Sequence, residues 1–447
     1  MTSLLPTAGK TVQAGLGRKN SMRRQGLQWK FHPQRDLLLA EAHARPSTPV
    51  QAPHLASRIA TMSGEGGVGA DRAHMAALCR KIGTSEPGPD ARWCVVDGGT
   101  WRLRWERHTE ISTWTVFRDS PATPDFMFEA TALDLLPQDW LAGLPGEVLG
   151  AAHVVLSTLA PEHLPFADSD IIAARVANGS IDVFSDFRPG PDSFTRFVMV
   201  QSDPNPVTAG RVLQQLFEIE TYRLLALLAF PLANSTSATL ARFEAEAAAS
   251  AMQVADEGGV EADRNLLSRL AALAGEAEAM VGATTYRFAA ARAYEGLVQE
   301  RIGQLRELAI EGRPTISDFM ERRLAPAMRT CVAVGDRQRD VIERIARTTQ
   351  MLNTRVEVAS EAINVGLLAS MDRRSQEQLR LQQTVEGLSV AAISYYSLGL
   401  IHFAMEGLSE AVFHFNAKAA TGISAPFVVL GVWFILRQLR KDISSEK

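Results

Sequence analysis

The sequence predicts an α+β domain followed by an all-α helical region, with a long stalk helix and a C-terminal two-helix transmembrane hairpin. Three observations predict this fold class. Short strand patterns joined by turns fill residues 31–203, helical patterns fill residues 204–385, and two uncharged apolar runs lie within residues 386–437. A disordered basic leader, residues 1–30, and a cytoplasmic tail, residues 438–447, complete the predicted organisation.

Composition and charge place the chain among globular proteins with more than one structural unit. The chain has 447 residues, of which 46% are hydrophobic and 21% are charged, and this length exceeds a single compact core. The formal net charge of -4 gives no reason to expect a nucleic-acid partner. Cys79, Cys94 and Cys331 lie far apart, without a Cys-x-x-Cys pair or a neighbouring His ligand, which predicts reduced thiols.

The leader contains basic residues and no acid, and it lacks the uninterrupted apolar stretch of a secretory signal. We expect it to be a disordered leader. Such a leader would result from an over-extended start, with Met22 as the true first residue. An organelle transit peptide is the alternative, because the leader has serine and arginine without acid.

Seven short runs predict the strands of the α+β domain. They are residues 93–96, 101–106, 111–117, 152–159, 171–176, 181–187 and 193–200. Asp97-Gly98-Gly99 is a strong hairpin signal between the first two runs, and Arg188-Pro189-Gly190-Pro191-Asp192 is a turn between the last two. Short helices are expected at residues 36–43, 70–82 and 138–144. The hairpin connections favour an α+β domain over a regular alternation of strands and helices.

One glycine-rich stretch, Gly64-Glu65-Gly66-Gly67-Val68-Gly69, formally matches Gly-x-Gly-x-x-Gly. That motif binds phosphate only where it joins a buried strand to a helix. The preceding residues 57–63 make a weak, half-polar strand pattern. A flexible glycine loop is therefore the favoured interpretation, with nucleotide binding as the alternative.

Helical patterns take over after the sequence Asp203-Pro204-Asn205-Pro206. Separate helices are predicted at residues 207–230, 240–255, 263–280 and 284–310. After Pro326 nothing breaks the helix, so the first apolar run should continue a long helix that begins near residue 327.

Apolar residues recur along this long helix at three- and four-residue steps. They are Val341, Ile345, Thr348, Leu352, Val356, Ala359 and Ile363. The stripe is only approximately heptad, because an extra four-residue step occurs at Val356. It can pack on helices of the same chain or on other subunits, and the second case predicts a homo-oligomer through the stalk and the first membrane helix.

Two uncharged runs, residues 387–405 and 419–436, predict helices that span a lipid bilayer. Basic residues lie at their outer ends: Arg373, Arg374 and Arg380 before the first run, and Arg437, Arg440 and Lys441 after the second. The intervening loop, residues 406–418, carries a single lysine. This asymmetry predicts a bacterial inner (plasma) membrane protein with both termini cytoplasmic and a short external loop.

Two groups of residues are candidates for function. The first is a charged cluster on neighbouring strands: Arg104, Glu106, Arg107, His108 and Glu110. His108 beside Glu110 could serve in acid–base chemistry or metal binding, but a solvated sheet face with ion pairs is the favoured interpretation. The second group is polar and lies in the first membrane run: Ser394, Tyr395, Tyr396 and His402. Packing and interfacial roles outweigh a role in permeation.

No recognised catalytic signature occurs in the sequence. The Ser/His/Asp elbow, the P-loop, His-Glu-x-x-His and cysteine-based zinc patterns are all missing. The sequence therefore predicts no catalytic residue, no cofactor and no metal site, and an enzyme has no positive support.

Several stretches spread along the chain are typical of one protein family. They are His32-Pro33, Glu41-Ala42-His43-Ala44-Arg45-Pro46, Leu103-Arg104-Trp105-Glu106-Arg107-His108-Thr109-Glu110, Glu220-Thr221-Tyr222-Arg223, Ser370-Met371-Asp372-Arg373-Arg374, Thr384-Val385-Glu386-Gly387-Leu388-Ser389-Val390 and Ala392-Ile393-Ser394-Tyr395-Tyr396. On these stretches the chain resembles a bacterial family of uncharacterised membrane-anchored proteins, catalogued as domain of unknown function 3422. The resemblance implies the same plan of soluble region, helical middle and membrane hairpin. It implies no activity, so no catalytic residue is transferred, and the leader lies outside it.

The predicted plan is also similar to that of CorA-type magnesium transporters. That family has a Gly-Met-Asn signature at the end of the first span, where this chain reads Ala404-Met405-Glu406-Gly407. We therefore expect a membrane-anchored scaffold or sensor with a cytoplasmic soluble region. An oligomeric CorA-like ion channel or transporter is the alternative. A similar arrangement of domains does not by itself establish that function.

Overall fold

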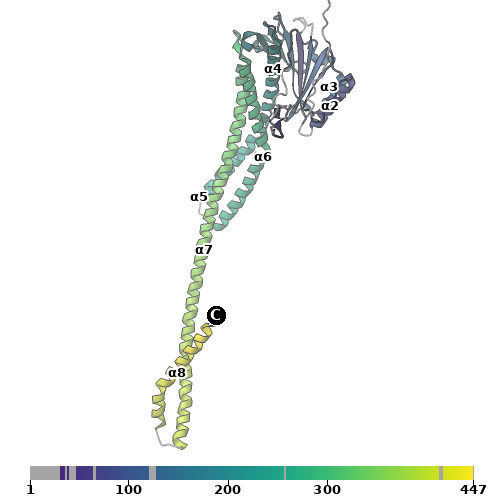
Figure 1. The fold of residues 1–447 in the computed structure, drawn as a ribbon. Helices are drawn as coiled ribbons and strands as arrows, with labels where there is room; N and C mark the ends of the chain where they lie inside the picture. The colour runs from purple at the N-terminus through teal and green to yellow at the C-terminus, as the bar shows by residue number, and fades with distance from the viewer. Residues whose placement is uncertain are drawn as a thin grey trace, which may run out of the picture. The chain divides into compact units, whose positions relative to one another are not determined.

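The computed structural model describes residues 31–35, 38–39, 47–63, 67–119, 127–255, 258–411 and 416–445 (Figure 1). The chain divides into two compact units. The first comprises Met1–Gln253 and Leu270–Arg347, and the second comprises Val254–Arg269 and Thr348–Lys447. The predicted leader and most of the predicted helix at residues 36–43 lie outside the described residues.

A nine-stranded mixed sheet forms the centre of the first unit, with the order β2-β3-β4-β1-β5-β8-β7-β6-β9. The strands are β1 (His54–Met62), β2 (Trp93–Asp97), β3 (Trp101–Arg107), β4 (Ile111–Asp119), β5 (Glu147–Ser157), β6 (Ile172–Val176), β7 (Ile181–Ser185), β8 (Thr195–Gln201) and β9 (Leu308–Ala309). Strands β5 and β8 pair in parallel, and the other neighbouring strands pair antiparallel. The seven predicted strands correspond to β2 through β8, and the predicted α+β class is confirmed.

Strand β1 is the main error of the strand prediction. The sequence pattern before the glycine stretch looks weak because polar residues alternate with apolar ones. In the structure eight of its nine residues are buried, because polar groups are satisfied by neighbouring strands: Arg58 donates to Thr115, and Trp114 donates to Thr61. The strand does lead to a helix, but Gly64–Gly66 lie outside the described residues, and both sheet neighbours of β1 are antiparallel to it. The parallel strand–helix–strand unit of dinucleotide-binding proteins is therefore not formed around β1.

Helices cover both faces of the sheet. On one face lie α2 (Gly67–Ile82), a 3₁₀ turn η2 (Ala132–Leu135) and α3 (Gln138–Ala142), and on the other lies α4 (Pro206–Leu227) (Figure 1). The first face carries the main apolar core, which includes Trp101, Leu103, Trp105, Trp114 and Trp140 together with Met75 and Leu78. The second face carries a smaller apolar cluster of Ala60, Ile111 and Leu225, with Tyr222 and Tyr294 packed against it. Where these helices cover the sheet, charged residues on either face are removed from solvent.

The helical region contains α5 (Ala229–Ala255), α6 (Gly259–Leu305), α7 (Ile316–Ala411) and α8 (Ala417–Ser445). The predicted break near Gly282 is wrong, since α6 is continuous across it. A glycine inside a helix costs about 1 kcal/mol, and burial of apolar residues on both sides outweighs that cost: Leu270 and Ala277 precede the glycine, and Ala291 and Val298 follow it. Helix α7 continues through the first apolar run, as predicted, but it begins at Ile316 and contains Pro326, whereas the predicted start lay near residue 327.

The connection between α6 and α7 is attached to the edge of the sheet. Its two-residue strand β9 pairs with β6, and the backbone N–H of Ala173 donates to the carbonyl of Pro314. The Glu307 carboxylate accepts the backbone N–H groups of Ile316 and Ser317, so it caps the first turn of α7. The long helix therefore begins at a fixed position on the first unit.

In the second unit, Val254–Arg269 and α7 are joined by an ion pair. Arg355 Nη2 lies 2.6 Å from Asp263 Oδ1, and the same guanidinium also donates to the carbonyl of Val254. Further along, α7 and α8 pack side by side, with His402 Nδ1 at 3.1 Å from Thr421 Oγ1 (Figure 1). The two predicted membrane runs therefore form a helical hairpin.

Candidate functional site

The predicted charged cluster is buried, which contradicts the interpretation of a solvated sheet face. Arg104, Glu106, Arg107 and Glu110 are each at most 8% exposed, and His108 is half-buried. The reason is the pair of helical layers on the sheet, because α2, α4 and α6 supply partners for these charges. The cluster does not converge on one site. It divides among three separate sets of contacts.

The first set joins β1, β3 and β4 beneath α4, and we call it the arginine network (Arg58, Arg104, Glu106 and Thr115). The strand register places Arg58, Thr115 and Arg104 side by side. Glu106 Oε2 lies 3.0 Å from Arg104 Nη2 and 3.9 Å from Arg58 Nη2. The Arg58 guanidinium also lies 4.9 Å from the ring centroid of Phe217 on α4, and burial lowers its pKa.

The second set fixes α2 to the sheet. Arg107 Nη1 lies 3.2 Å from Asp71 Oδ2, and both Ser63 and Ser112 donate hydrogen bonds to the same oxygen. Asp71 is fully buried within α2. A buried charge pair of this kind is a structural element whose disruption leaves an uncompensated charge.

The third set joins the β3–β4 connection to α6. Glu110 accepts hydrogen bonds from Arg287 Nη2 at 2.6 Å and from the Tyr294 hydroxyl at 2.9 Å. Burial alone would raise the pKa of Glu110, but these hydrogen bonds outweigh it and lower the pKa. His108 Nε2 lies 3.4 Å from Thr113 Oγ1. Glu110 is thus bound to Arg287 and Tyr294 of α6, and His108 contacts Thr113 on β4.

The structure brings Ser57, His153 and Asp192 together, a group that no local sequence pattern predicted. Ser57 Oγ lies 2.7 Å from His153 Nδ1, and His153 Nε2 lies 3.5 Å from Asp192 Oδ2. The imidazole stacks on Phe194 with centroids 4.2 Å apart, and burial lowers its pKa to about 4. These are the residue types of a nucleophile, base and acid, but Ser57 is only 1% exposed in the middle of β1. No substrate can reach it, so the constellation holds β1, β5 and the β7–β8 connection together.

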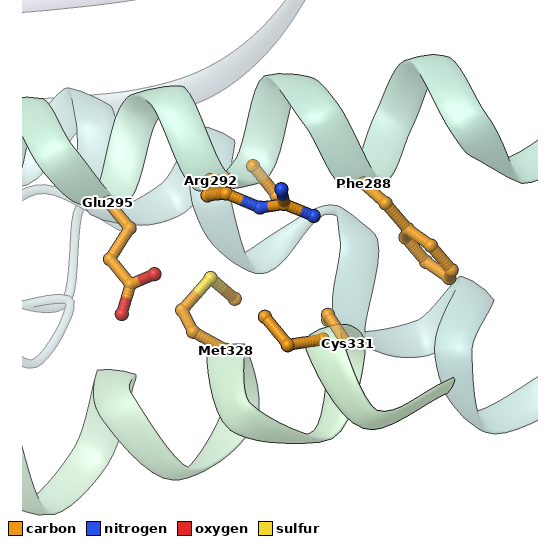
Figure 2. A pocket seen from close by; sticks show the side chains of 7 residues that line it. Phe288, Arg292, Glu295, Met328 and Cys331 are labelled. Carbon is orange, nitrogen blue, oxygen red and sulfur yellow. The ribbon is translucent and has the colours of Figure 1, made fainter. Parts of the chain in front are cut away.

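Two cavities bear on the search for a ligand site. The smaller lies between α6 and α7, where Phe288, Arg292 and Glu295 face Met328 and Cys331 (Figure 2). Its volume of about 10 Å³ is room for a single water at most. Burial raises the pKa of Glu295 at its rim. This void is a packing feature and no ligand site.

The larger cavity, which we call the β1 cleft, has a volume of about 260 Å³. It opens where β1 begins and β4 ends, on the sheet face that carries the arginine network. Its lining residues are Thr48, Pro49, Val50, Gln51, His54, Asp97, Gly99, Thr100, Trp101, Arg102, Phe117, Asp119 and Pro206. His54 Nδ1 lies 3.0 Å from Asp119 Oδ1, and burial lowers the pKa of His54. Within the described ranges, no group of three or more His, Cys, Asp or Glu residues could hold a metal ion.

The polar residues of the first membrane run take two different positions. Ser394 is 4% exposed, and His402 bonds to Thr421 of α8, so both face the hairpin interior. Tyr395 and Tyr396 are largely exposed. Around them the outward surface carries large exposed apolar side chains: Leu388, Ile393, Leu400, Phe403, Ile423, Phe427, Leu430, Trp433, Phe434 and Ile435.

Three helical stretches of the described residues are long and apolar enough to cross a membrane, by length and composition only. They are Pro206–Val254, Ile316–Gly407 and Ala417–Gln438. A third of the apolar window of the first stretch is buried inside the protein, against 6% and 0% for the other two. The first stretch therefore belongs to the packed first unit, and the other two carry the exposed apolar surface.

Comparison with known families gives one match. The model of a family described as a protein of unknown function (DUF3422) matches residues 30–443. No curated protein matches the sequence. The family match covers the sheet, the long helices and the hairpin together.

Proposed function

This chain belongs to the family of proteins of unknown function DUF3422, and from its structure we propose that it is a membrane-anchored scaffold or sensor. In this proposal the α7–α8 hairpin lies in the bilayer and the first unit works in the cytoplasm at the membrane surface. The membrane in this proposal is the bacterial inner membrane. Both termini lie in the cytoplasm, and residues 406–418 lie outside.

The distribution of side chains on the hairpin is the single observation that carries the proposal. Large apolar groups such as Leu400, Phe403 and Phe427 are each 72% exposed, whereas Ser394 and His402 are turned inward. Exposed apolar area costs about 25 cal/mol per Å² in water and nothing comparable in hydrocarbon. Polar groups, in contrast, need partners inside a bilayer. Lipid is therefore the solvent that fits this surface.

The ends of the hairpin support the proposed orientation. Arg437 follows the second apolar run, and its guanidinium lies 4.9 Å from the ring centroid of Trp433. Tryptophan and arginine are both favoured at the boundary between hydrocarbon and headgroups. The basic residues at both outer ends of the hairpin place that boundary on the cytoplasmic side by the positive-inside rule.

The stalk part of α7 supports self-association within this proposal. Large apolar side chains are exposed on it: Val358, Ile363, Val365, Leu367, Leu368, Met371, Leu379, Leu381 and Val385. Of these, Leu381, Val385 and Leu388 follow one another at four- and three-residue steps. Leu367 and Met371, about three to four turns earlier, are also four residues apart. Copies held in one membrane with one orientation would present this face in parallel, which favours a homo-oligomer through the stalk and the first membrane helix.

The CorA-like channel is the weaker proposal, because no specific observation favours it. Of the inward polar groups of the hairpin, His402 contacts Thr421 of α8, and Ser394 is buried with no hydrogen-bond partner among the described residues. The buried charged residues of the candidate cluster are committed to ion pairs: Arg104 with Glu106, Arg107 with Asp71, and Glu110 with Arg287. These contacts suit a stable framework for binding partners rather than a catalytic centre.

Cysteine labelling of intact cells tests the anchor and its orientation together. Glu410→Cys lies in the predicted external loop, and Lys441→Cys lies in the predicted cytoplasmic end. We expect a membrane-impermeant maleimide to label Glu410→Cys in intact cells and Lys441→Cys only after permeabilisation. Wild-type protein is the matched control, because Cys79 and Cys331 are buried and Cys94 is half-buried. Extraction of the protein by alkaline carbonate, or the reverse labelling pattern, would contradict the proposal.

A further inference from the structure

We propose that the β1 cleft binds a small α-amino acid with a basic side chain, such as L-lysine or L-arginine. The inference does not depend on the proposed membrane anchor, because every residue it uses belongs to the first unit.

The strand register builds the floor of the cleft. His54, the first residue of β1, pairs with Asp119, the last residue of β4. Two residues further in, Phe117 pairs with Arg102, and Arg102 pairs with Asp97 on β2. Residues that pair directly, or lie two apart on a strand, share a face of the sheet. One cation, two carboxylates, an imidazole and an aromatic ring are therefore gathered on one face at one end of the sheet.

The opposite wall of the cleft is formed by residues 48–51. Hydrogen bonds and a close approach to the backbone of α4 hold this segment in place. The backbone N–H of Val50 donates to the carbonyl of Pro206 at 3.1 Å, and Arg104 Nη1 lies 3.5 Å from Thr48 Oγ1. A Cβ on Gly210 of α4 would lie 2.0 Å from the Thr48 carbonyl oxygen, so only glycine allows this approach. The arginine network and α4 thus hold the segment at residues 48–51 in place beside the cleft.

The charged side chains of the cleft differ in whether they have a protein partner. Arg102 is exposed, and no ion pair or hydrogen bond of its guanidinium occurs among the described residues. Asp97 and Asp119 each use one carboxylate oxygen, the first with the Gly99 N–H at 2.9 Å and the second with His54. His54 adds no charge near neutral pH, because burial lowers its pKa. The cleft therefore offers one unpaired cation and two carboxylates that each keep an oxygen for a ligand.

This charge set selects the ligand class. A guanidinium binds a carboxylate in a two-pronged manner, and carboxylates accept hydrogen bonds from ammonium or guanidinium groups. An anionic ligand would meet two carboxylates, and a simple diamine would leave Arg102 unused. A zwitterion with a second positive group satisfies all three charges, and its methylene chain can lie against Phe117 or Trp101. The volume of about 260 Å³ limits the ligand to this small size.

Calorimetric titration of the full-length protein in lipid nanodiscs tests the ligand class. L-lysine and L-arginine are the main probes, L-norleucine lacks the side-chain cation, cadaverine lacks the carboxylate, and L-glutamate reverses the side-chain charge. We expect the two basic amino acids to bind, norleucine and cadaverine to bind at least ten-fold more weakly, and glutamate to give no heat. Absence of binding by lysine and arginine, or equal binding by glutamate, would overturn the inference.

Variants locate the binding within the cleft. Arg102→Gln should weaken lysine binding ten-fold or more but should not weaken the binding of cadaverine, because cadaverine has no carboxylate to lose and the variant removes a positive charge that repels it. Asp119→Asn should weaken both ligands. Arg211→Gln is the matched control, because Arg211 is an exposed arginine on α4 that does not line the cleft. Unchanged lysine affinity in Arg102→Gln would place the site elsewhere and overturn the inference, and the ligand series on the wild-type protein decides the question if a variant is poorly folded.

Discussion

The first unit and the C-terminal hairpin distribute polar and apolar side chains in opposite ways. In the first unit, Arg58, Arg107 and Asp71 are almost fully buried, and each has a charged or hydroxyl partner. In the hairpin, Phe403 and Phe427 are each 72% exposed, and Ser394 lies inside. A water-soluble domain tolerates buried charge only when it is paired, and a surface in lipid tolerates exposed apolar area without cost.

The difference teaches which observations bear on function in this chain. The sheet-face charges, which look like a site in the sequence, join strands to helices in the structure. The hairpin surface, which looks like a simple run of apolar residues, is the strongest indication of the surrounding medium. The β1 cleft differs from both, because its arginine, Arg102, is exposed and has no ion-pair or hydrogen-bond partner among the described residues. Four changes test these contrasts, in order of expected effect.

Asp71→Ala should have the largest effect on the first unit. It leaves the buried Arg107 without its carboxylate, and loss of one partner of a buried ion pair costs about 3–5 kcal/mol. Urea unfolding followed by the fluorescence of the buried Trp105 and Trp114 measures the change. Asp139→Ala is the control, because its ion pair with Lys81 is exposed and should change the unfolding midpoint little. Similar effects of the two substitutions would mean that burial does not decide the role of these charges.

Leu430→Arg should have the next largest effect, on membrane insertion. Leu430 is 61% exposed on α8, and arginine at the centre of a spanning helix costs about 2.5–3.5 kcal/mol. The fraction of protein that resists alkaline carbonate extraction measures the loss. Leu159→Arg is the matched control, because Leu159 is 64% exposed on the first unit, where a surface substitution should stay within about 0.5 kcal/mol. If both variants remain fully in the membrane, the hairpin surface does not face lipid.

Acidification should destabilise the first unit through His153. Burial lowers the folded-state pKa of His153 to about 4, below the value near 6.5 of an exposed histidine. Between these values the unfolded chain binds the proton and the folded chain does not, so stability is full above about pH 6.5 and falls as the pH drops towards 4. The loss approaches roughly 3 kcal/mol at about 1.4 kcal/mol per pKa unit.

His153→Gln isolates this contribution from that of other titrating groups. The difference in unfolding free energy between wild type and variant should shrink steadily from pH 7 to pH 4.5. Urea unfolding at several pH values measures it. A difference that stays constant across this range would show that His153 is protonated equally in the folded and unfolded states.

Thr421→Val should have the smallest effect. It removes the hydroxyl that contacts His402, and hydrogen bonds between membrane helices contribute about 0.6 kcal/mol on average. Thermal unfolding of the hairpin in detergent micelles, followed by circular dichroism, measures the change. Thr421→Ser retains the hydroxyl and should behave as wild type. A loss of several kcal/mol in Thr421→Val would indicate that the polar hairpin interior does more than align two helices.

The sequence predicted the fold better than it predicted the site. Seven strands, the continuation of α7 from the stalk into the first apolar run and the family could be predicted, because each depends on local periodicity, turns or motifs. Strand β1 was not predicted, because the hydrogen-bond partners of its polar residues lie on strands that are distant in sequence. The break at Gly282 was predicted wrongly because the burial that outweighs a helical glycine comes from tertiary packing.

The candidate cluster was located correctly in space but interpreted wrongly. Along β3, Arg104 and Glu106 lie on the face opposite Leu103 and Trp105, as the alternation of side chains in a strand requires. The partners Arg58, Asp71 and Arg287 come from other elements, so no pattern along β3 could reveal them. The β1 cleft was likewise beyond prediction, since its residues come together only when β1, β2, β3 and β4 pair. The Asp97-Gly98-Gly99 turn was its one local sign, and it indicated a hairpin only.

The position of Arg347 along the chain has a consequence for synthesis. The first unit, including the edge strand β9, is complete in sequence at Arg347, about 40 residues before the first apolar run begins. At about 5–20 residues per second, translation of that interval takes roughly 2–8 s, and domains generally fold as units in the order in which they are made. If the hairpin is inserted into a membrane as proposed, the stalk of α7 separates folding of the first unit from that insertion in time. The sheet can then close before the apolar runs of the hairpin have left the ribosome.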